Sequence, residues 1–324
     1  MKKYHKNILV TGGAGYIGSC LITFLKKKFN VYVVDNLSIG KKSQIKSKFF
    51  YKINLSNRTE LDKFLKQKKF DAVIHLAGKK AAGESMKNPL IYLENNITGT
   101  INLIKSCIEN GINILIFSSS AAVYGEPKYL PLDEKHSLSP INYYGYTKLA
   151  IENHLKWFSD LIGFRYAALR YFNAAGYDLE NRVIGLEKNP QNLIPIVMEV
   201  ANLQRDALDI FGNDYKTKDG TGIRDYIHVT DLAKAHIDAL DYLLKKQVSI
   251  TVNLGVERGY SVLEIIEMVA KISGKKIEYN IVDRRKGDID TIIADYSLAN
   301  HLLGWVPENS NLKTIIESTW KVYA

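Results

Sequence analysis

A tyrosine and a lysine, Tyr144 and Lys148, stand four residues apart at the start of a predicted helix that runs from about residue 143 to 161. Residues i and i+4 of a helix lie on one face, so the phenol and the ammonium should be neighbours. A free tyrosine has a pKa of about 10, and a nearby positive charge favours its phenolate form. The pair is therefore a candidate for a base that accepts a proton at neutral pH.

The same spacing also occurs at Tyr124 and at Tyr242, so the pattern alone carries little weight. Pro127 lies between Tyr124 and its lysine, and a proline prevents a regular helical turn at that place. Tyr242 lies at the far end of a later predicted helix, with no cofactor motif near it. Sequence context thus selects Tyr144.

Three serines, residues 118–120, end an apolar run that predicts a strand. Active sites of open parallel sheets form at the carboxyl ends of their strands. A hydroxyl at Ser120 could therefore bond a substrate oxygen and pass its proton to Tyr144. Serines at strand ends are also ordinary loop formers, so both interpretations stay open at this point.

A glycine-rich segment, residues 11–18, follows a short apolar run near the start of the chain. A helical pattern and a second β-rich run, residues 31–34, come after it. In this strand–turn–helix–strand order, Gly12, Gly15 and Gly18 would let the backbone approach a dinucleotide pyrophosphate at a helix N-terminus. An ordinary glycine-rich turn is the alternative. A hydride-accepting cofactor beside a proton acceptor predicts a redox site for an alcohol.

The second β-rich run ends at Asp35, 17 residues after Gly18. A carboxylate at this place can accept hydrogen bonds from a ribose 2′-hydroxyl and would repel a 2′-phosphate, which favours NAD over NADP. Lys41 and Lys42 could serve a phosphate and keep NADP open. With NAD bound, lowering the phenol pKa to ~7 requires ~4 kcal/mol from the nicotinamide charge and the neighbouring lysine.

Composition restricts the class of protein. The 324 residues are 46% apolar and 24% charged, as expected of a globular chain with a large core. The net charge of +10 comes from lysines spread over predicted helix exteriors, without the concentrated patch or module of a nucleic-acid-binding protein. Cys20 and Cys107 fall in apolar helical patterns, which favours buried free thiols over a disulfide or a metal site. We find no signal peptide and no run of ~18 apolar residues, so a cytoplasmic location is expected and a membrane is not.

Strand-like and helical patterns alternate through the first half of the chain, which predicts an α/β fold with a doubly wound parallel (Rossmann) sheet. After Asn173 the regularity weakens, and a smaller, mostly C-terminal lobe for substrate is expected. The predicted domains are residues 1–175 for the dinucleotide and mainly residues 176–324 for substrate, with residues 225–260 returning to the Rossmann sheet. The predicted elements are strands at 49–53, 70–76, 112–117, 164–169 and 250–254, and helices at 58–69, 89–110, 143–161, 231–245 and 261–272.

Beyond the single motifs, the chain resembles the UDP-glucose 4-epimerases (UDP-galactose 4-epimerases) of the extended short-chain dehydrogenase/reductase superfamily over nearly its whole length. The segment from residue 211 to 229 is the most specific to this branch. The segments that carry the resemblance are residues 11–18, 35–37, 75–85, 94–96, 118–125, 144–148, 169–173, 210–215, 219–229 and 285–288.

The resemblance implies an isomerase with tightly held NAD. Tyr144 would take the proton of the sugar 4-hydroxyl while hydride passes from C4 to the nicotinamide, the 4-keto sugar would turn over, and hydride would return to its opposite face. Lys148 would hold the nicotinamide ribose and polarise Tyr144, and Ser120 would shuttle the proton. The residues implied around NAD are Gly12, Gly15, Tyr16, Ile17, Gly18, Asp35, Asn36, Asn54, Leu55, Leu76, Ala77, Gly78, Lys80, Asn95, Ser118, Tyr144, Lys148 and Tyr171.

The resemblance also implies a UDP-sugar substrate and a homodimer built on the helices near 89–110 and 143–161. Two arginines suit a pyrophosphate through charged, fork-shaped hydrogen bonds, although surface ion pairing is the alternative. The residues implied around the UDP-sugar are Ser120, Tyr144, Asn173, Asn192, Leu193, Ile210, Phe211, Arg224, Arg285, Asp288 and Ile292.

Two positions depart from the family pattern. Asn54 replaces an aspartate that many relatives direct at the adenine amino group, although its amide oxygen can still accept. Ile292 occupies the position that walls off the sugar C2 substituent, and an isoleucine is smaller than an aromatic residue. UDP-N-acetylhexosamines therefore become possible substrates.

Other functions remain to be weighed. A sugar-nucleotide 4,6-dehydratase would need an acidic pair where Ser119 and Ser120 stand, and serines cannot eliminate water. A reductase would exchange soluble NADH at each turnover. Another UDP-sugar 4-epimerase, acting on a uronate, a pentose or an N-acetylhexosamine, and a non-enzymatic nucleotide sensor are the remaining alternatives.

Overall fold

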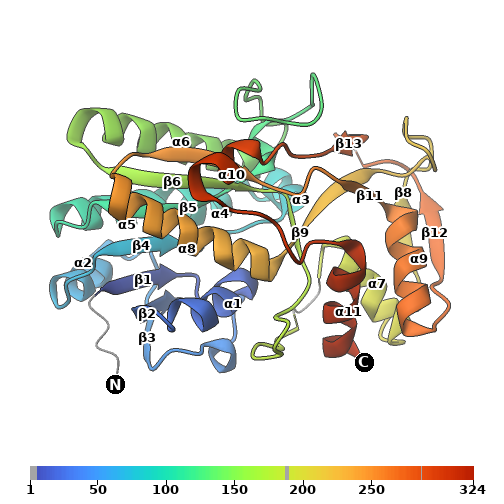
Figure 1. Ribbon diagram of the computed structural model, residues 1–324, viewed down its shortest axis with the longest axis horizontal. Helices are drawn as coiled ribbons and strands as arrows, with labels where there is room; N and C mark the ends of the chain where they lie inside the picture. The colour runs from blue at the N-terminus through green and yellow to red at the C-terminus, as the bar shows by residue number, and fades with distance from the viewer. Residues whose placement is uncertain (1–5, 187–189, 286) are drawn as a thin grey trace.

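A computed structural model describes residues 6–186, 190–285 and 287–324. Its largest element is a seven-stranded, entirely parallel sheet in the order β3-β2-β1-β4-β5-β6-β10, which confirms the predicted Rossmann architecture (Figure 1). The strands are β1 (Asn7–Thr11), β2 (Asn30–Asp35), β3 (Phe49–Lys52), β4 (Ala72–His75), β5 (Ile114–Ser120), β6 (Arg165–Tyr171) and β10 (Ile250–Leu254).

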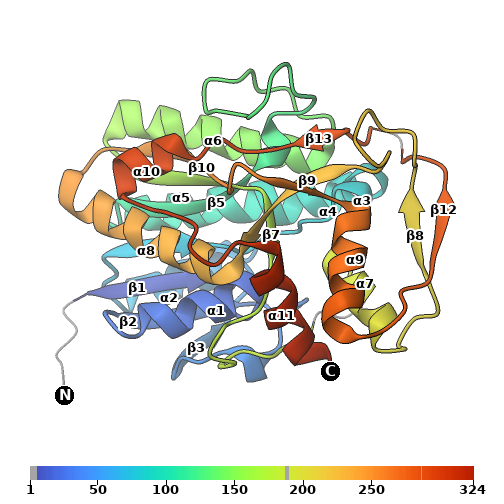
Figure 2. The ribbon, with the colours of Figure 1, turned by 45° about the vertical axis from the view of Figure 1, so that its right-hand side comes forward.

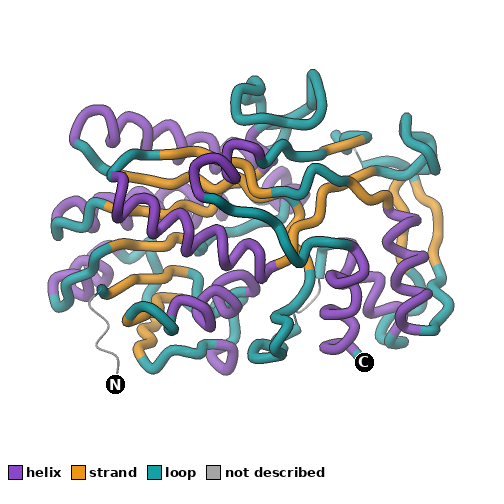
Figure 3. Tube along the Cα trace, viewed as in Figure 1, coloured by secondary structure: helices purple, strands orange, loops and turns teal. Residues whose placement is uncertain are grey.

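Both faces of this sheet are covered by helices, because alternate residues of each strand point to opposite sides. In β1, Ile8 and Val10 join one apolar cluster and Leu9 joins the other. Figures 1 and 3 show α1 and α8 in front of the strands. One face packs against α1 (Tyr16–Leu25), α8 (Val229–Lys246) and α10 (Ser297–Leu303), and the other against α2 (Arg58–Lys66), α5 (Gly99–Glu109) and α6 (Tyr143–Ile162).

The helix that carries the Tyr144/Lys148 pair is bounded by strong local signals. The Asn142 side chain accepts a hydrogen bond from the Gly145 N–H and caps α6 at its start. Gly163 ends the helix in the left-handed conformation, with φ of 68°. These signals explain why the predicted bounds of about 143 and 161 agree with the structure.

The predicted helix over residues 89–110 is not uniform. It consists of α4 (Pro89–Tyr92), the π-helical stretch η2 (Leu93–Thr98) and α5. The Asn95 Nδ2 donates to the Ile91 carbonyl at 2.8 Å, so a side chain of the widened segment bonds a carbonyl of α4 just before it. Widened turns of this kind often occur at functional sites. The predicted stop is confirmed, because Gly111 has a φ of 72° just after the helix.

A second lobe lies beside the carboxyl ends of the strands (Figure 2). Its sheets are β11-β9-β13 with β7 also on β9, and the pair β12-β8. Its helices share a third apolar cluster. The elements are β7 (Asn173–Ala175), α7 (Leu193–Ala201), β8 (Leu208–Phe211), β9 (Ile223–His228), β11 (Gly259–Ser261), α9 (Val262–Ser273), β12 (Tyr279–Val282), β13 (Thr291–Ile292) and α11 (Leu312–Tyr323).

Within the segment expected to return to the large sheet, residues 225–260, α8 and β10 pack on or join that sheet. The strands β9 and β11 of the same segment belong to the small sheet instead. Sequence analysis also missed α7, α10 and α11. The start of α11 could have been predicted from the sequence, because Asn311 is a typical N-cap residue and apolar residues recur after it at helical spacing. In the structure, the Asn311 side chain accepts a hydrogen bond from the Thr314 N–H.

Short elements connect the larger ones: η1 (Lys42–Gln44), α3 (Ala82–Lys87) and η3 (Ala121–Val123).

Both cysteines, Cys20 and Cys107, are buried free thiols. None of the helices within the described residues is long and apolar enough to cross a membrane. Lys286, which belongs to a segment that carries the resemblance, lies outside the described residues.

Candidate active site

A large cavity of about 730 Å³ is lined both by residues at the carboxyl ends of the large sheet and by residues of the second lobe. Nearly every residue implied by the sequence lines it, although the two groups lie far apart along the chain. From the Rossmann half these are Gly12, Gly15, Tyr16, Ile17, Gly18, Asp35, Asn36, Asn54, Leu55, Leu76, Ala77, Gly78, Lys80, Asn95, Ser118, Ser120, Tyr144, Lys148 and Tyr171. From the later segments they are Asn173, Asn192, Leu193, Ile210, Phe211, Arg224, Arg285 and Asp288.

Ile292 is the exception, since it is not part of the lining. Its side chain packs in a small cluster with Phe172, and Phe172 does line the cavity. In the sheet, Ile292 is paired with Arg224, which also lines the cavity. Ile292 was expected to form part of the cavity wall. It lies instead next to two residues that do line the cavity, Phe172 and Arg224.

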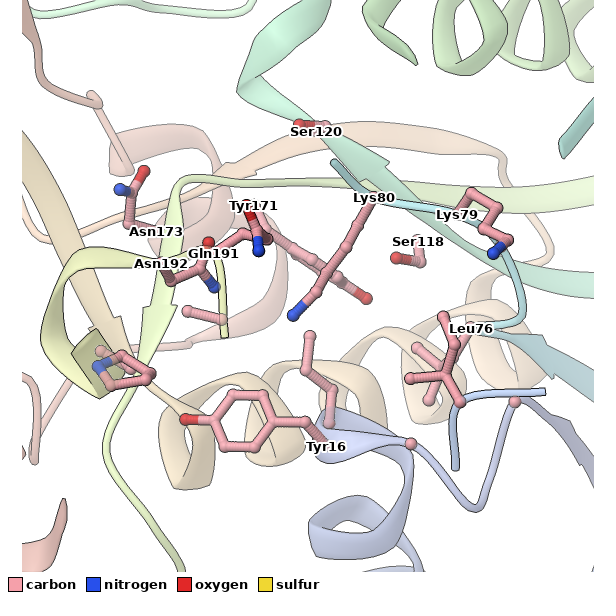
Figure 4. A pocket seen from close by; sticks show the side chains of 18 of the residues that line it. Tyr16, Leu76, Lys79, Lys80, Ser118, Ser120, Tyr171, Asn173, Gln191 and Asn192 are labelled. Carbon is pink, nitrogen blue, oxygen red and sulfur yellow. The ribbon is translucent and has the colours of Figure 1, made fainter. Parts of the chain in front are cut away.

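Figure 4 shows the two sides of the cavity. Ser118 and Ser120 lie on one side, Asn173 and Asn192 lie on the other, and the Lys80 side chain extends between them. The strand β5 therefore presents its serines toward the segments that follow β6.

The glycine turn fits a cofactor that must approach the backbone closely. Gly12 has a φ of +74°, and a Cβ there would lie 2.5 Å from the Ala77 nitrogen. A Cβ on Gly18 would lie 2.4 Å from the Gly12 oxygen. Gly15 is the N-cap of α1 without a side-chain cap, so the first N–H groups of the helix have no side-chain partner there. An uncapped helix N-terminus at a cavity suits an anionic group.

Asp35 lies at the rim of the same turn. Its Oδ2 accepts from the Ala14 N–H at 3.0 Å and its Oδ1 from the Leu37 N–H at 2.8 Å. Each carboxylate oxygen can accept a second bond, so acceptor capacity remains for a ribose hydroxyl. Lys41 lines the cavity, and its ammonium donates to the Leu186 carbonyl at 3.3 Å.

The amide oxygen of Asn54 is already engaged. It accepts from the Ser56 N–H at 3.2 Å and from the Ser56 hydroxyl at 2.9 Å. Two bonds fill the usual acceptor capacity of an amide oxygen. An adenine amino group would therefore have to displace Ser56 to use it.

Lys148 is buried, with 6% of its surface exposed, and its Nζ donates to the Ser118 carbonyl at 2.7 Å. Burial lowers the pKa of Lys148 to about 8, and the carboxylate of Glu152 partly opposes this. The Nζ lies 5.8 Å from the centre of the Tyr144 ring, so the predicted neighbours do share one helix face.

The pKa of Tyr144 was expected to fall when NAD is bound, and this stays a prediction. Burial raises the pKa of Tyr144, and a hydrogen bond with Ser120 partly opposes this. The ammonium of Lys148 is directed at Ser118 instead. The phenolate form therefore depends on charge that a bound cofactor would supply.

Asn96 is a buried site residue that sequence analysis did not single out. Its Oδ1 accepts from the Lys79 N–H at 2.8 Å, and its Nδ2 donates to the Lys79 carbonyl at 2.9 Å and to the Thr147 hydroxyl at 3.1 Å. It thereby joins the loop after β4 to α6. Its position beside the implied Asn95 was the available signal.

Two buried histidines also support the site. His75 joins Thr11 and Thr100 through its ring nitrogens, and burial lowers its pKa to about 3, so it is neutral. The Tyr171 hydroxyl hydrogen-bonds the Nε2 of His236, and burial raises the pKa of Tyr171. Both contacts hold cavity-lining strand ends in place.

At the far end of the cavity, an aromatic ring packs against the guanidinium of Arg285. The Arg285 guanidinium lies 3.6 Å from the centre of the Phe211 ring. Asp288 accepts from the Tyr215 hydroxyl at 3.3 Å. Tyr215, Gln191 and Arg205 line the cavity as well, and sequence analysis did not name them. This end combines positive charge with flat surfaces, as a nucleotide diphosphate requires.

Comparison with known proteins identifies the class. Residues 8–255 match the model of the NAD dependent epimerase/dehydratase family, and the chain belongs to that family. The chain is 44% identical to the UDP-glucose 4-epimerase of Halalkalibacterium halodurans, over 97% of this chain and 94% of that protein.

Solved structures agree. The UDP-glucose 4-epimerase from Brucella ovis in complex with NAD has a TM-score of 0.95 and 39% identity, over 98% of both chains. The UDP-glucose 4-epimerase from Bifidobacterium longum in complex with NAD+ and UDP has a TM-score of 0.92 and 37% identity, over 98% of this chain and 97% of the other. NAD is the cofactor of the family to which this chain belongs.

Replacing Gly18 with alanine should weaken NAD binding about tenfold or more, because the added Cβ would collide with the Gly12 carbonyl and overpacking costs roughly 1–3 kcal/mol. The NAD retained by the purified protein and the Kd for added NAD measure this effect. Gly83→Ala is the matched control, since a Cβ there meets nothing within 4 Å. Equal NAD retention in Gly18→Ala and the native protein would contradict the proposed cradle.

Proposed function

We propose that this chain interconverts UDP-glucose and UDP-galactose by transient oxidation at C4 of the sugar, with NAD held in the glycine turn. The observation that carries the proposal is one cavity lined both by that turn and by Ser120, Tyr144 and Arg224. NAD, when bound, supplies the hydride acceptor and donor at C4. The chain's own residues bind, orient and move the proton.

Tyr144 accepts the proton of the sugar 4-hydroxyl, directly or through Ser120. Ser120 partly opposes the rise in the pKa of Tyr144, and this closeness of the two side chains supports a short relay between them. Lys148 is anchored on Ser118 and carries the positive charge beside the phenol ring. Because its pKa is lowered to about 8, the ammonium persists at neutral pH and is lost as the pH rises above that value.

The residues of the second lobe hold the UDP moiety while the sugar turns. Arg224 and Arg285 bind the pyrophosphate through fork-shaped hydrogen bonds. The Phe211 ring packs against the guanidinium of Arg285. Asn173, Asn192, Leu193, Ile210 and Asp288 complete this part of the lining. Anchoring the nucleotide alone leaves the 4-keto sugar free to present its opposite face.

The other functions fit less well. A 4,6-dehydratase would use acidic residues at Ser119 and Ser120, and the Ser119 hydroxyl is bound to the buried Glu152. An ordinary reductase would need added cofactor at each turnover, so activity of the purified protein without added NAD separates the two. A nucleotide sensor would bind UDP-galactose without forming UDP-glucose.

Tyr144→Phe should reduce interconversion by about 100- to 10,000-fold, because the variant keeps the ring but loses the group that accepts the proton. NAD and UDP binding should stay near native levels. Conversion of UDP-galactose to UDP-glucose by chromatography, with UDP affinity by calorimetry, measures both. Lys148→Ala should in addition loosen NAD. Unchanged turnover in Tyr144→Phe would remove the proposed base.

We further propose a homodimer built on α4, η2 and α6. Apolar side chains on these neighbouring elements are exposed: Leu90 by 75%, Tyr146 by 51%, Trp157 by 63% and Leu161 by 70%. Tyr146, Trp157 and Leu161 recur at helical spacing on one face of α6. Such a stripe of exposed apolar side chains is typical of a surface that a partner covers.

Trp157→Glu should convert the dimer to a monomer, because a charge would have to be buried in the interface. Light scattering after size exclusion gives the mass directly. Leu203→Glu is the control, since Leu203 is 86% exposed and lies outside this stripe. A native protein that is already monomeric at assay concentration would contradict the proposal.

We propose that UDP-N-acetylhexosamines are also accepted. Ile292 lies next to the cavity wall rather than in it, packed with Phe172, so no bulky side chain from this position fills the sugar end. Ile292→Tyr should therefore lower conversion of UDP-N-acetylgalactosamine about tenfold or more while UDP-galactose conversion changes little. Assays of the variant with the two substrates in parallel measure this selectivity. An equal change in the conversion of both substrates would contradict the proposal.

The thiols of Cys20 and Cys107 are free and buried, and burial raises the pKa of Cys20 to about 12. Two unpaired thiols suit a reducing compartment. We propose the cytoplasm as the location of this chain.

A further inference from the structure

We propose that Glu152 and Arg170 are positioning residues of this site, a buried ion pair that holds β5 and α6 in register and sustains the charge on Lys148. The proposal rests on the proposed function. Neither residue lines the cavity, so each acts through others.

The pair is buried and doubly bonded. Glu152 is 6% exposed and Arg170 is 4% exposed. The Nε of Arg170 donates to one carboxylate oxygen of Glu152 at 3.0 Å, and its Nη2 donates to the other at 2.6 Å. Two parallel bonds fix the orientation of both groups.

Polar contacts link the pair, which lies on α6 and β6, to the strands β5 and β10. The Ser119 hydroxyl donates to Glu152, and Ser119 stands between Ser118 and Ser120 in β5. The Nη1 of Arg170 donates to the Tyr124 hydroxyl at 2.9 Å, and that hydroxyl donates to the Asn253 side chain in β10 at 2.6 Å. The pair therefore ties α6, β5, β6 and β10 together beneath the cavity.

A role in stability alone does not require charge at this place. Desolvating two ions is costly, and apolar side chains of similar volume often stabilise a core equally well or better. The ion pair is better explained by what it does for its neighbours. The Ser119 hydroxyl is held toward α6 by Glu152, and the side chains of Ser118 and Ser120 therefore extend from the opposite face of β5, because successive strand residues alternate.

Glu152 also stands one helical turn after Lys148, and its carboxylate favours the ammonium form of that lysine. The other described groups around Lys148 are without negative charge. They are the Ser118 carbonyl and the Phe117 ring from β5, the Tyr144 phenol from α6, and the neutral imidazole of His75 from β4. Among these groups, Glu152 is thus the carboxylate that favours the ammonium form of Lys148. Arg170 offsets part of the charge of Glu152 and so weakens this effect on Lys148.

Opposite charge changes should therefore move the alkaline limb of the kcat–pH profile in opposite directions. Glu152→Gln removes the attraction on Lys148, so the limb should shift to lower pH by about one unit, as expected for losing a close opposite charge. Arg170→Met frees the carboxylate, so the limb should shift to higher pH. The KM for UDP-galactose should stay near the native value in both variants.

Each single variant leaves one charge buried without its partner, so folding is checked by circular dichroism. The double variant Glu152→Gln/Arg170→Met leaves no unpaired charge and keeps an acceptor for Ser119. It should fold and retain NAD, yet lose kcat about 10- to 100-fold through misplacement of the catalytic groups. Glu109→Gln is the control, since Glu109 forms an exposed two-bond pair with Arg58.

Native kcat in the folded double variant, or limb shifts in the same direction for both folded single variants, would overturn the proposal. A native protein that interconverts no UDP-sugar at any pH would instead refute the proposed function. The two failures are therefore distinguishable, because the native pH profile is measured first.

Discussion

The hydrogen bond from the Lys148 ammonium to the Ser118 carbonyl is the contact on which the site depends. It joins α6 to β5 just beyond Phe117, the last residue of β5 that pairs with β4. A buried ammonium without such an acceptor would be costly, so the lysine and the strand end constrain each other. Tyr144 and Ser120 then face the same cavity because they extend from these two joined elements.

The opposite wall follows from close backbone approach at the glycine turn. Gly12, Gly13 and Gly18 each lie too near a neighbour to accept a Cβ without a shift. This closeness brings the start of α1 against the end of β4, and the first turn of the helix opens into the cavity. A dinucleotide held there by its pyrophosphate and a sugar nucleotide held by the second lobe would share the cavity that Ser118 and Ser120 also line.

Charge is distributed to suit this arrangement. The cavity-lining cations, which include Lys80, Arg224 and Arg285, come from separate segments, while the ammonium of Lys148 is compensated internally by a carbonyl and by Glu152. The net charge of +10 is therefore mostly unrelated to catalysis. The cations that matter for the substrate are the few directed at the cavity.

The sequence by itself determined the elements whose signals are local. The turn at Gly12 to Gly18, the capped helix after Asn142 and the alternating apolar strands could be predicted, because each depends on residues within a few positions of one another. Nearly all of the residues that the resemblance implied do line the cavity, although many other lining residues were not implied. Short strands such as β7 and β13 could not be predicted, since they exist only through pairing with β9.

Only the tertiary structure decided the environment of the catalytic groups. Burial raises the pKa of Tyr144 and Lys148 turns to Ser118, and neither follows from spacing along the chain. The pairing of Glu152 with Arg170 is also invisible in the sequence, because the two residues lie on different elements. Desolvation and hydrogen bonding depend on which distant segments pack together, and that information appears only when the chain is folded.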